Sequence, residues 1–150
     1  MDNKAKYNSY TAGWDRINQS IEQGFFLEAV AIEESIIFDR LRSFLVFYEG
    51  GDIDNTVPLK RIVRRWQEAM NRMVKEDRSF SFDGQLVSDT LAWVDDRNAV
   101  IHTIVRSKPG EPTREITEFL IHAEQTAKSG KLIARAISDW FRRQKAISSD

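Results

Sequence analysis

The sequence predicts an all-α protein, an up-and-down bundle of about five helices that forms a single domain over residues 1–150. Apolar residues recur every three or four positions along most of the chain, which is the spacing of one face of an α-helix. Short segments rich in glycine, proline or polar residues separate these stretches, as connections between helices do. Hydrophobic residues make up 41% and charged residues 30% of the chain, a balance typical of a globular domain.

The first two helices are expected at residues 3–23 and 25–49. Gly24 separates them, and the pair Gly50-Gly51 after the second suits a left-handed helix cap. The apolar stripe of the first helix consists of Tyr7, Tyr10, Trp14, Ile17 and Ile21. The stripe of the second consists of Leu27, Val30, Ile37, Leu41, Phe44 and Tyr48. Each stripe keeps one phase, which predicts one continuous helix for each segment.

A third helix is expected after Asn55 or Thr56, either of which can cap it, with Pro58 tolerated in its first turn. Its buried side consists of Leu59, Ile62, Val63, Trp66, Met70, Met73 and Val74. The fourth helix is expected at residues 84–107. The segment 108–112, which holds two prolines and a glycine, should end it.

The last helix is expected to begin after a cap at Thr113. Its apolar stripe consists of Ile116, Leu120, Ala123, Ala127, Gly130, Ala134, Ile137 and Phe141. The stripe runs through Gly130 without losing phase, which favours one long helix in which a small residue permits close packing. A break at Ser129-Gly130 is the alternative.

Composition removes several classes of function. The chain has no cysteine, which excludes disulfides, thiolate nucleophiles and cysteine zinc sites. No apolar run reaches the roughly 18–20 residues of a bilayer span, and the polar N-terminus does not resemble a signal peptide, so a cytoplasmic protein without a membrane partner is expected. The formal net charge is −1, so any affinity for nucleic acid must come from local clusters.

Two charged residues occupy positions where the helices should be apolar. Arg97 falls in the middle of the apolar side of the fourth helix, and Glu34 lies on the apolar stripe of the second. A guanidinium keeps its charge and needs an acceptor, so we expect Glu34 to pair with Arg97. A salt bridge that only fixes helix register is the simpler interpretation of this pair. The apolar side of the fourth helix consists of Val87, Leu91, Trp93, Val94, Val100, Ile101, Ile104 and Val105.

A row of polar residues borders that apolar side. Asp95, Asn98, His102 and Arg106 follow one another at spacings of three, four and four, so Asn98 and His102 are neighbours on one ridge with Arg97 beside them. A lone histidine on an amphipathic helix is usually structural. The company of arginine and asparagine favours a functional site instead.

The run Asp96-Arg97-Asn98-Ala99-Val100-Ile101-His102 resembles the motif of the HEPN superfamily, an arginine, usually a polar residue, and a histidine four to six residues beyond the arginine on a late helix of an all-α bundle. Arg97, Asn98 and His102 match the motif. The segment 28–45 also resembles the long second helix of such proteins. The resemblance covers most of the chain in architecture, but only these few residues carry its specific part.

The resemblance implies a metal-independent endoribonuclease without a cofactor, in a toxin–antitoxin or antiphage-defence system. His102 would move protons between the ribose 2′-hydroxyl and the leaving 5′-oxygen, and Arg97 would bind the phosphate. Asn98 would orient His102 or bind a phosphate oxygen, with Glu34 and Asp95 in support, and the product would be a 2′,3′-cyclic phosphate. The expected partners are RNA, a second copy of the chain in a two-fold dimer, and an antitoxin or nucleotidyltransferase. Ile104 replaces a tyrosine of some toxins paired with a nucleotidyltransferase, so regulation by modification of that tyrosine is not expected.

Basic residues on the third helix are a candidate track for an RNA backbone, although a solvated helix face is the simpler interpretation. The track consists of Arg61, Arg64, Arg65 and Arg72, flanked by Lys60 and Lys75. The second histidine, His122, lies off its helix stripe and is expected to be exposed. The alternative functions are a non-catalytic helical module that binds a nucleotide or a protein, and a purely structural bundle.

Overall fold

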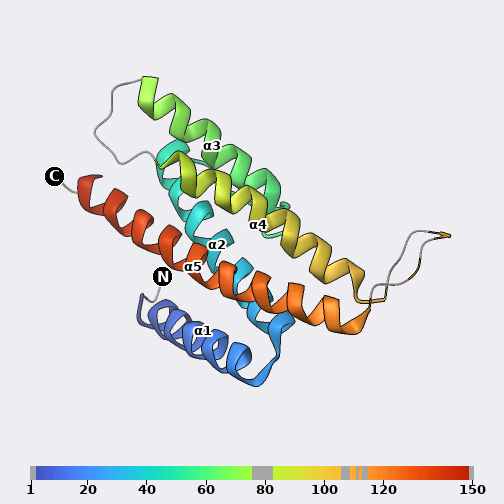
Figure 1. The fold of residues 1–150 in the computed structure, drawn as a ribbon. Helices are drawn as coiled ribbons and strands as arrows, with labels where there is room; N and C mark the ends of the chain where they lie inside the picture. The colour runs from blue at the N-terminus through green and yellow to red at the C-terminus, as the bar shows by residue number, and fades with distance from the viewer. Residues whose placement is uncertain (1–2, 76–82, 106–108, 111, 113–114, 149–150) are drawn as a thin grey trace.

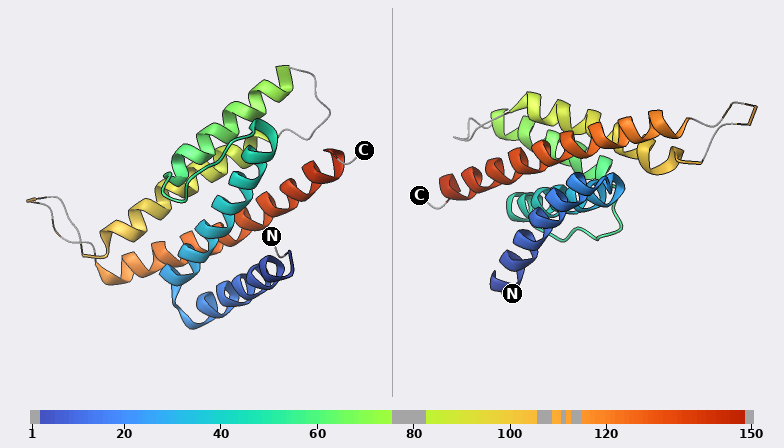
Figure 2. Two further views of the ribbon diagram at one scale, coloured as in Figure 1. Left: turned by 180° about the vertical axis from the view of Figure 1, so that it is seen from behind. Right: turned by 60° about the horizontal axis from the view of Figure 1, so that its bottom comes forward.

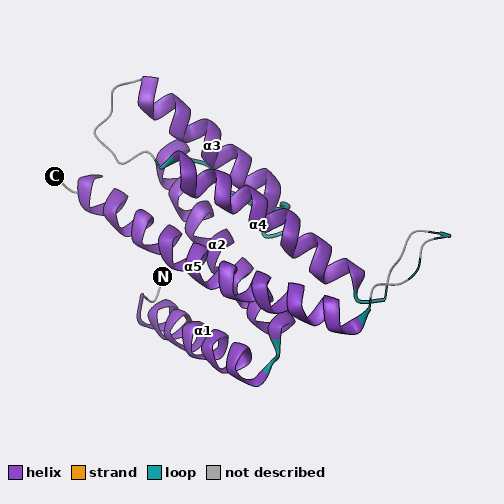
Figure 3. Ribbon diagram, viewed as in Figure 1, coloured by secondary structure: helices purple, strands orange, loops and turns teal. Residues whose placement is uncertain are grey.

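The computed structural model describes residues 3–75, 83–105, 109–110, 112 and 115–148, and within these it contains five α-helices and no strand (Figure 1, Figure 3). The helices are α1 (Asn3–Gln23), α2 (Phe26–Glu49), α3 (Leu59–Lys75), α4 (Gly84–Thr103) and α5 (Ile116–Ser148). The predicted all-α class with five helices is therefore confirmed. No helix in this described part is long and apolar enough to cross a membrane.

Helices α2 and α5 cross at the centre of the bundle and share its most extensive interface. Helix α1 packs on one side of this pair, and α3 and α4 pack on the other (Figure 1). Of the predicted stripe of α1, Ile17 is fully buried, whereas Tyr7 is 71% exposed and does not belong to the core.

One step of the bundle departs from the up-and-down prediction. Helix α3 runs in the same direction as α2, because segment 50–58 returns along the bundle before α3 begins (Figure 2). A segment of this length spans up to about 30 Å when extended, which is enough for the return. An ion pair agrees with this direction, since Glu49 at the end of α2 contacts Arg72 near the end of α3.

Large aromatic side chains from three helices meet in the core. The rings of Trp66 on α3 and Trp140 on α5 lie edge to face with centroids 5.3 Å apart, and both side chains are fully buried. Phe44 on α2 contacts the Trp140 ring at 4.7 Å in the same manner. Such pairs each contribute about 0.5–1.5 kcal/mol beyond the area they bury, so this cluster fixes how α2, α3 and α5 pack.

Helix α4 is shorter than predicted. Asp83 caps its start, since the Asp83 carboxylate accepts a hydrogen bond from the Leu86 N–H at 2.9 Å. The helix ends at Thr103 and not at residue 107. Val105 is 77% exposed, so beyond Thr103 the apolar stripe has no surface to pack against. Three residues with a predicted role are not described by the structure. These are the Val74 side chain, Arg106 and Thr113.

Helix α5 is a single helix that passes through Gly130, so the alternative of a break there is wrong. A Cβ atom at Gly130 would lie 2.7 Å from atoms of the Trp93 indole and would overlap the Glu33 carboxylate. Glycine therefore allows α5 to approach α2 and α4 more closely than any other residue would permit.

Candidate functional site

Arg97 and Asn98 line a cleft of about 610 Å³ between α2, segment 50–58 and α4. The cleft brings together residues that are far apart in the sequence. Its lining consists of Glu34, Ser35, Phe38, Asp39, Arg42, Asn55, Thr56, Val57, Pro58, Leu59, Lys60, Val94, Arg97 and Asn98. Its polar side chains include both donors and acceptors of hydrogen bonds, so the cleft can bind a polar ligand.

The Arg97 guanidinium is held by two neighbours. Its Nε donates to Oε2 of Glu34 at 2.7 Å, and its Nη2 lies 2.6 Å from the same oxygen. Its Nη1 donates to Oδ1 of Asn98 at 2.7 Å. The Arg97 and Glu34 side chains are 23% and 25% exposed, so the pair lies at the edge of the core and not inside it. The predicted pairing of Glu34 with Arg97 is confirmed.

The local sequence explains this position. Trp93 and Val94 are each 2% exposed, and their burial fixes which face of α4 packs against the core. Arg97 follows one turn later, where the edge of α2 presents Glu34. The prediction that Arg97 sits within an apolar surface was therefore only partly right, because Trp93 and Val94 pack inside the chain.

His102 lies in the last turn of α4 and is exposed to solvent. It follows Asn98 by four residues on the same ridge, which places it about 6 Å further along the helix axis. It is not among the residues that line the cleft. The structure therefore brings Arg97, Asn98 and Glu34 together and leaves His102 just beyond them, at the end of the helix where a positive charge is favoured.

Asp95, predicted to support the site, faces a different neighbour. Its Oδ1 lies 3.0 Å from Nζ of Lys60 on α3, and the two side chains are exposed. An exposed pair of this kind contributes at most about 1 kcal/mol. Among the described residues, the hydrogen bond of Asp95 goes to Lys60 and links α4 to α3, whereas those of Arg97 go to Glu34 and Asn98.

A second polar network, missed from the sequence, lies further along α2 in the same cleft. The Asp39 carboxylate accepts hydrogen bonds from Nζ of Lys6 at 3.1 Å and from the Tyr10 hydroxyl, and it lies 3.4 Å from Nη2 of Arg42. Burial raises the pKa of Asp39, but these hydrogen bonds and positive charges outweigh burial and hold the pKa below its usual value. Arg42 also donates to Oδ1 of Asn55. This network ties α1 and segment 50–58 to α2.

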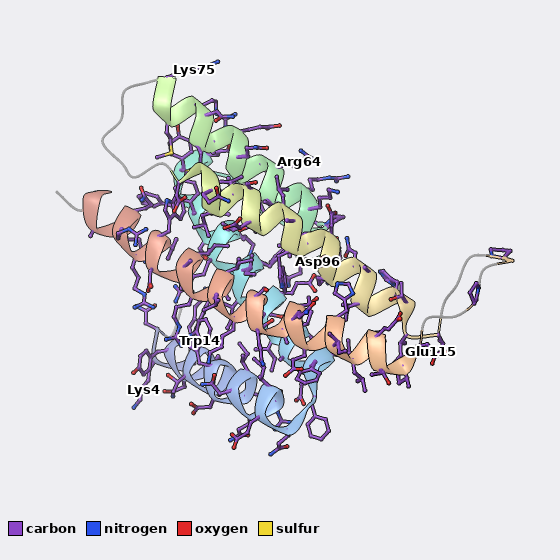
Figure 4. The ribbon with its side chains drawn as sticks, in the orientation of Figure 1. Lys4, Trp14, Arg64, Lys75, Asp96 and Glu115 are labelled. Atoms are coloured by element: carbon purple, nitrogen blue, oxygen red, sulfur yellow. The ribbon has the colours of Figure 1, made fainter. Side chains whose placement is uncertain are left out.

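The basic residues of α3 fall into two groups. Arg65 and Arg72 both contact Glu49, so part of their charge is balanced within the chain. Arg61 and Arg64 are exposed, and Figure 4 shows Arg64 on the outer side of α3. Of the predicted track, these two side chains form no ion pair with the described residues.

His122 is not simply exposed, as its position off the stripe predicted. Its side chain is 21% exposed, and Nε2 lies 3.6 Å from Oδ1 of Asp96, which α4 presents toward α5 (Figure 4). The contact arises because α4 and α5 pack side by side at this level, which the wheel of α5 alone does not reveal.

Glu33 is a further residue that was not predicted from the sequence. It is fully buried, and neither carboxylate oxygen receives a hydrogen bond from the described residues. Burial raises the pKa of the Glu33 carboxyl to about 9, and the nearby Lys131 opposes this only in part. Glu33 lies three residues after Val30 and four before Ile37, so its spacing marked an inward position as clearly as that of Glu34 did.

The fold and the cleft define an all-α bundle protein with a polar site on its α2–α4 side. Comparison of the chain with protein-family models, with curated proteins and with solved structures finds no match. Among the described residues, no group of three or more His, Cys, Asp or Glu side chains lies close enough to hold a metal ion. The function must therefore be argued from the site itself.

Proposed function

We propose that this chain is a metal-independent endoribonuclease of HEPN type that acts as a toxin or antiphage-defence component and cuts RNA to a 2′,3′-cyclic phosphate. One observation carries the proposal. The Arg97 guanidinium is fixed by Glu34 and Asn98 at the edge of an open cleft, and His102 is exposed one turn further along the same helix. Cleavage through a 2′-hydroxyl uses a cation that binds the phosphate and an imidazole that transfers protons, and these two groups project from the same helix.

The chemistry assigns a role to each side chain. His102 takes the proton of the ribose 2′-hydroxyl, and the oxygen attacks the adjacent phosphorus. The bond to the 5′-oxygen breaks as that oxygen takes a proton from the protonated His102 of a second copy of the chain. A guanidinium has five N–H donors, so the contacts of Arg97 with Glu34 and Asn98 leave donors for the phosphate. Asn98 keeps the guanidinium plane in place.

The test replaces each residue of the motif in turn. Arg97→Ala and His102→Ala should each slow cleavage of single-stranded RNA by about 10²–10⁴-fold, the usual contribution of a proton-transfer group or a charge-stabilising group. His122→Ala is the matched control and should cleave at the wild-type rate. If His122 matters and His102 does not, the assignment is wrong. If no form cuts RNA, a non-catalytic module that binds a nucleotide or a protein takes its place.

We also propose that the active form is a two-fold dimer in which a second copy of the chain supplies a second His102. Large apolar side chains gather at the end of the bundle that holds His102. Those exposed there are Phe25, Ile104, Val105, Ile116, Leu120 and Ile121. Several of them line an apolar groove of about 370 Å³ between the α1–α2 turn and α5. Exposed apolar surface of this kind is typical of a protein interface.

Two exposed apolar residues separate a specific interface from general stickiness. Val105→Asp should convert the dimer to a monomer and reduce cleavage together, because it puts a charge into the proposed interface. The control is Leu132→Asp, because Leu132 is 70% exposed against 77% for Val105 but lies outside the proposed interface, on α5. It should change neither the mass nor the cleavage rate. Light scattering at micromolar concentration measures the mass. A monomeric wild type that cuts RNA at full rate would contradict the composite site.

A further inference from the structure

The cleft beside Arg97 has the size and lining of a small-molecule site. Its volume of about 610 Å³ lies within the range of ~300–1,000 Å³ that is usual for ligand pockets. Apolar side chains line it from separate segments, with Phe38 on α2, Val57 before α3 and Val94 on α4. The Arg42 guanidinium lies 5.2 Å from the Phe38 ring centroid, so a cation and a ring already stack at the wall. Such surfaces accept a flat heterocycle such as a nucleobase.

The polar groups around these surfaces match the edge of a base. Oδ1 of Asn98 accepts from Arg97, which leaves the Asn98 amide N–H groups as donors. Both contacts of Arg97 with Glu34 involve Oε2, so among the described residues Oε1 is left to accept from an exocyclic amine. A base in the cleft can therefore meet both a donor and an acceptor.

The rim near α3 favours an anion. Lys60 lines the cleft, and its partner Asp95 is 66% exposed, so a phosphate can replace this weak pair at little cost. The first turn of α3 also opens onto the cleft at Leu59 and Lys60, and the start of a helix attracts negative charge.

We propose that this cleft binds one nucleoside phosphate unit, with the base against Phe38, Val57 and Val94 and the phosphate at the rim. If the proposed function holds, on which this inference rests, the bound nucleoside phosphate is a nucleotide of the RNA substrate. The cleft then determines which base lies next to the cleaved bond. Asn98 lines the cleft one helical turn before His102, so a nucleotide held there lies one turn from the proposed proton-transfer group. A free nucleotide has the same chemistry and is the other source of the ligand.

The experiment fills the cleft and compares two matched variants. Thr56 is exposed and lines the cleft, so Thr56→Trp should occupy it without disturbing the core. Thr11→Trp makes the same change at an exposed site on α1 outside the cleft. Titration calorimetry with AMP, CMP, GMP and UMP in EDTA measures binding. Four DNA strands, each with a single ribonucleotide of one base, measure the preference of cleavage.

We expect the wild type to bind at least one of the four nucleotides and to prefer one ribonucleotide by about tenfold. Thr56→Trp should weaken the binding by about tenfold and remove the preference, and Thr11→Trp should keep both. If the wild type cleaves all four strands equally and Thr56→Trp still weakens nucleotide binding, the site is assigned to a free nucleotide. Binding without any RNA cleavage removes the ribonuclease proposal and keeps the site. A Thr56→Trp protein that binds and discriminates like the wild type overturns the inference, as does a wild type that does neither.

Discussion

Two consecutive glutamates on α2 meet opposite environments. Glu34 lies at the edge of the cleft, is about one quarter exposed, and shares one oxygen with two nitrogens of Arg97. Glu33 is fully buried against Gly130 and Trp93 and receives no hydrogen bond from the described residues. Consecutive residues point about 100° apart on a helix, so Glu34 faces α4 and Glu33 faces α5.

The difference shows that position and not residue type decides what a carboxylate does. At the edge of the core, Glu34 contacts the Arg97 guanidinium and fixes its position in the cleft. In the core, burial raises the pKa of the Glu33 carboxyl, because an unpaired charge in an apolar environment is strongly unfavourable. The carboxyl therefore stays protonated and neutral. Glu34 therefore belongs to the candidate site, and Glu33 lowers the stability of the fold at high pH.

The largest effect is expected for Glu33→Gln. The pKa of Glu33 rises from a usual value of 4.5 to about 9 on folding, so between these values the folded chain binds more protons than the unfolded chain. Stability from this group is therefore fully present below pH 4.5 and is lost as pH rises toward 9, by up to about 1.4 kcal/mol per pH unit. Glu33→Gln cannot ionise and should remove that loss. Urea unfolding at pH 5 and pH 8 measures the difference.

Glu34→Gln is the matched control for this experiment. It should lower the free energy of unfolding by about 1–2 kcal/mol at pH 7, since Arg97 loses a charged partner but keeps Asn98 and some water. The slope of stability against pH between 5 and 8 should stay that of the wild type. Equal slopes for the two glutamine variants would show that the two carboxyls are not different after all.

A smaller effect is expected where α5 approaches Glu33. Gly130→Ala places a Cβ atom against the Glu33 carboxylate and the Trp93 indole, and overpacking of this kind costs about 1–3 kcal/mol. Gly13→Ala is the control, because its Cβ would meet Ile32 and Ile36 at 3.6 and 3.8 Å, which is ordinary contact. In a helix that change should instead stabilise by about 0.5–1 kcal/mol. Thermal unfolding compares the two, and a Gly130→Ala protein as stable as the wild type would contradict the close packing.

The helices were predictable because their apolar spacing is local information. The ends of α1 matched the prediction, and the continuity of α5 followed from the phase of its stripe. The direction of α3 was not predictable. The residues of segment 50–58 fit a tight turn between antiparallel helices as well as the longer return along the bundle that the structure has. The end of α4 was placed too late because residues 104 and 105 continue the stripe in sequence without packing in the structure.

The site was predictable where a charge stood in an apolar stripe. That rule found Arg97 and Glu34 and gave their pairing. It missed Glu33, because the helical wheel of α2 alone points both glutamates toward the core. Which of them contacts a cation depends on how α4 and α5 pack against α2. It also missed Asp39 and Arg42, whose partners lie on α1 and in segment 50–58.

The most direct measurement of the central claim is cleavage of a single-stranded RNA by the purified protein in EDTA, with the ends of the products identified by mass spectrometry. We expect cleavage without added metal and 2′,3′-cyclic phosphate ends, because the proposed chemistry uses His102 and Arg97 alone. A strict need for Mg²⁺ or Mn²⁺, or products that end in a 3′-hydroxyl, would contradict the account.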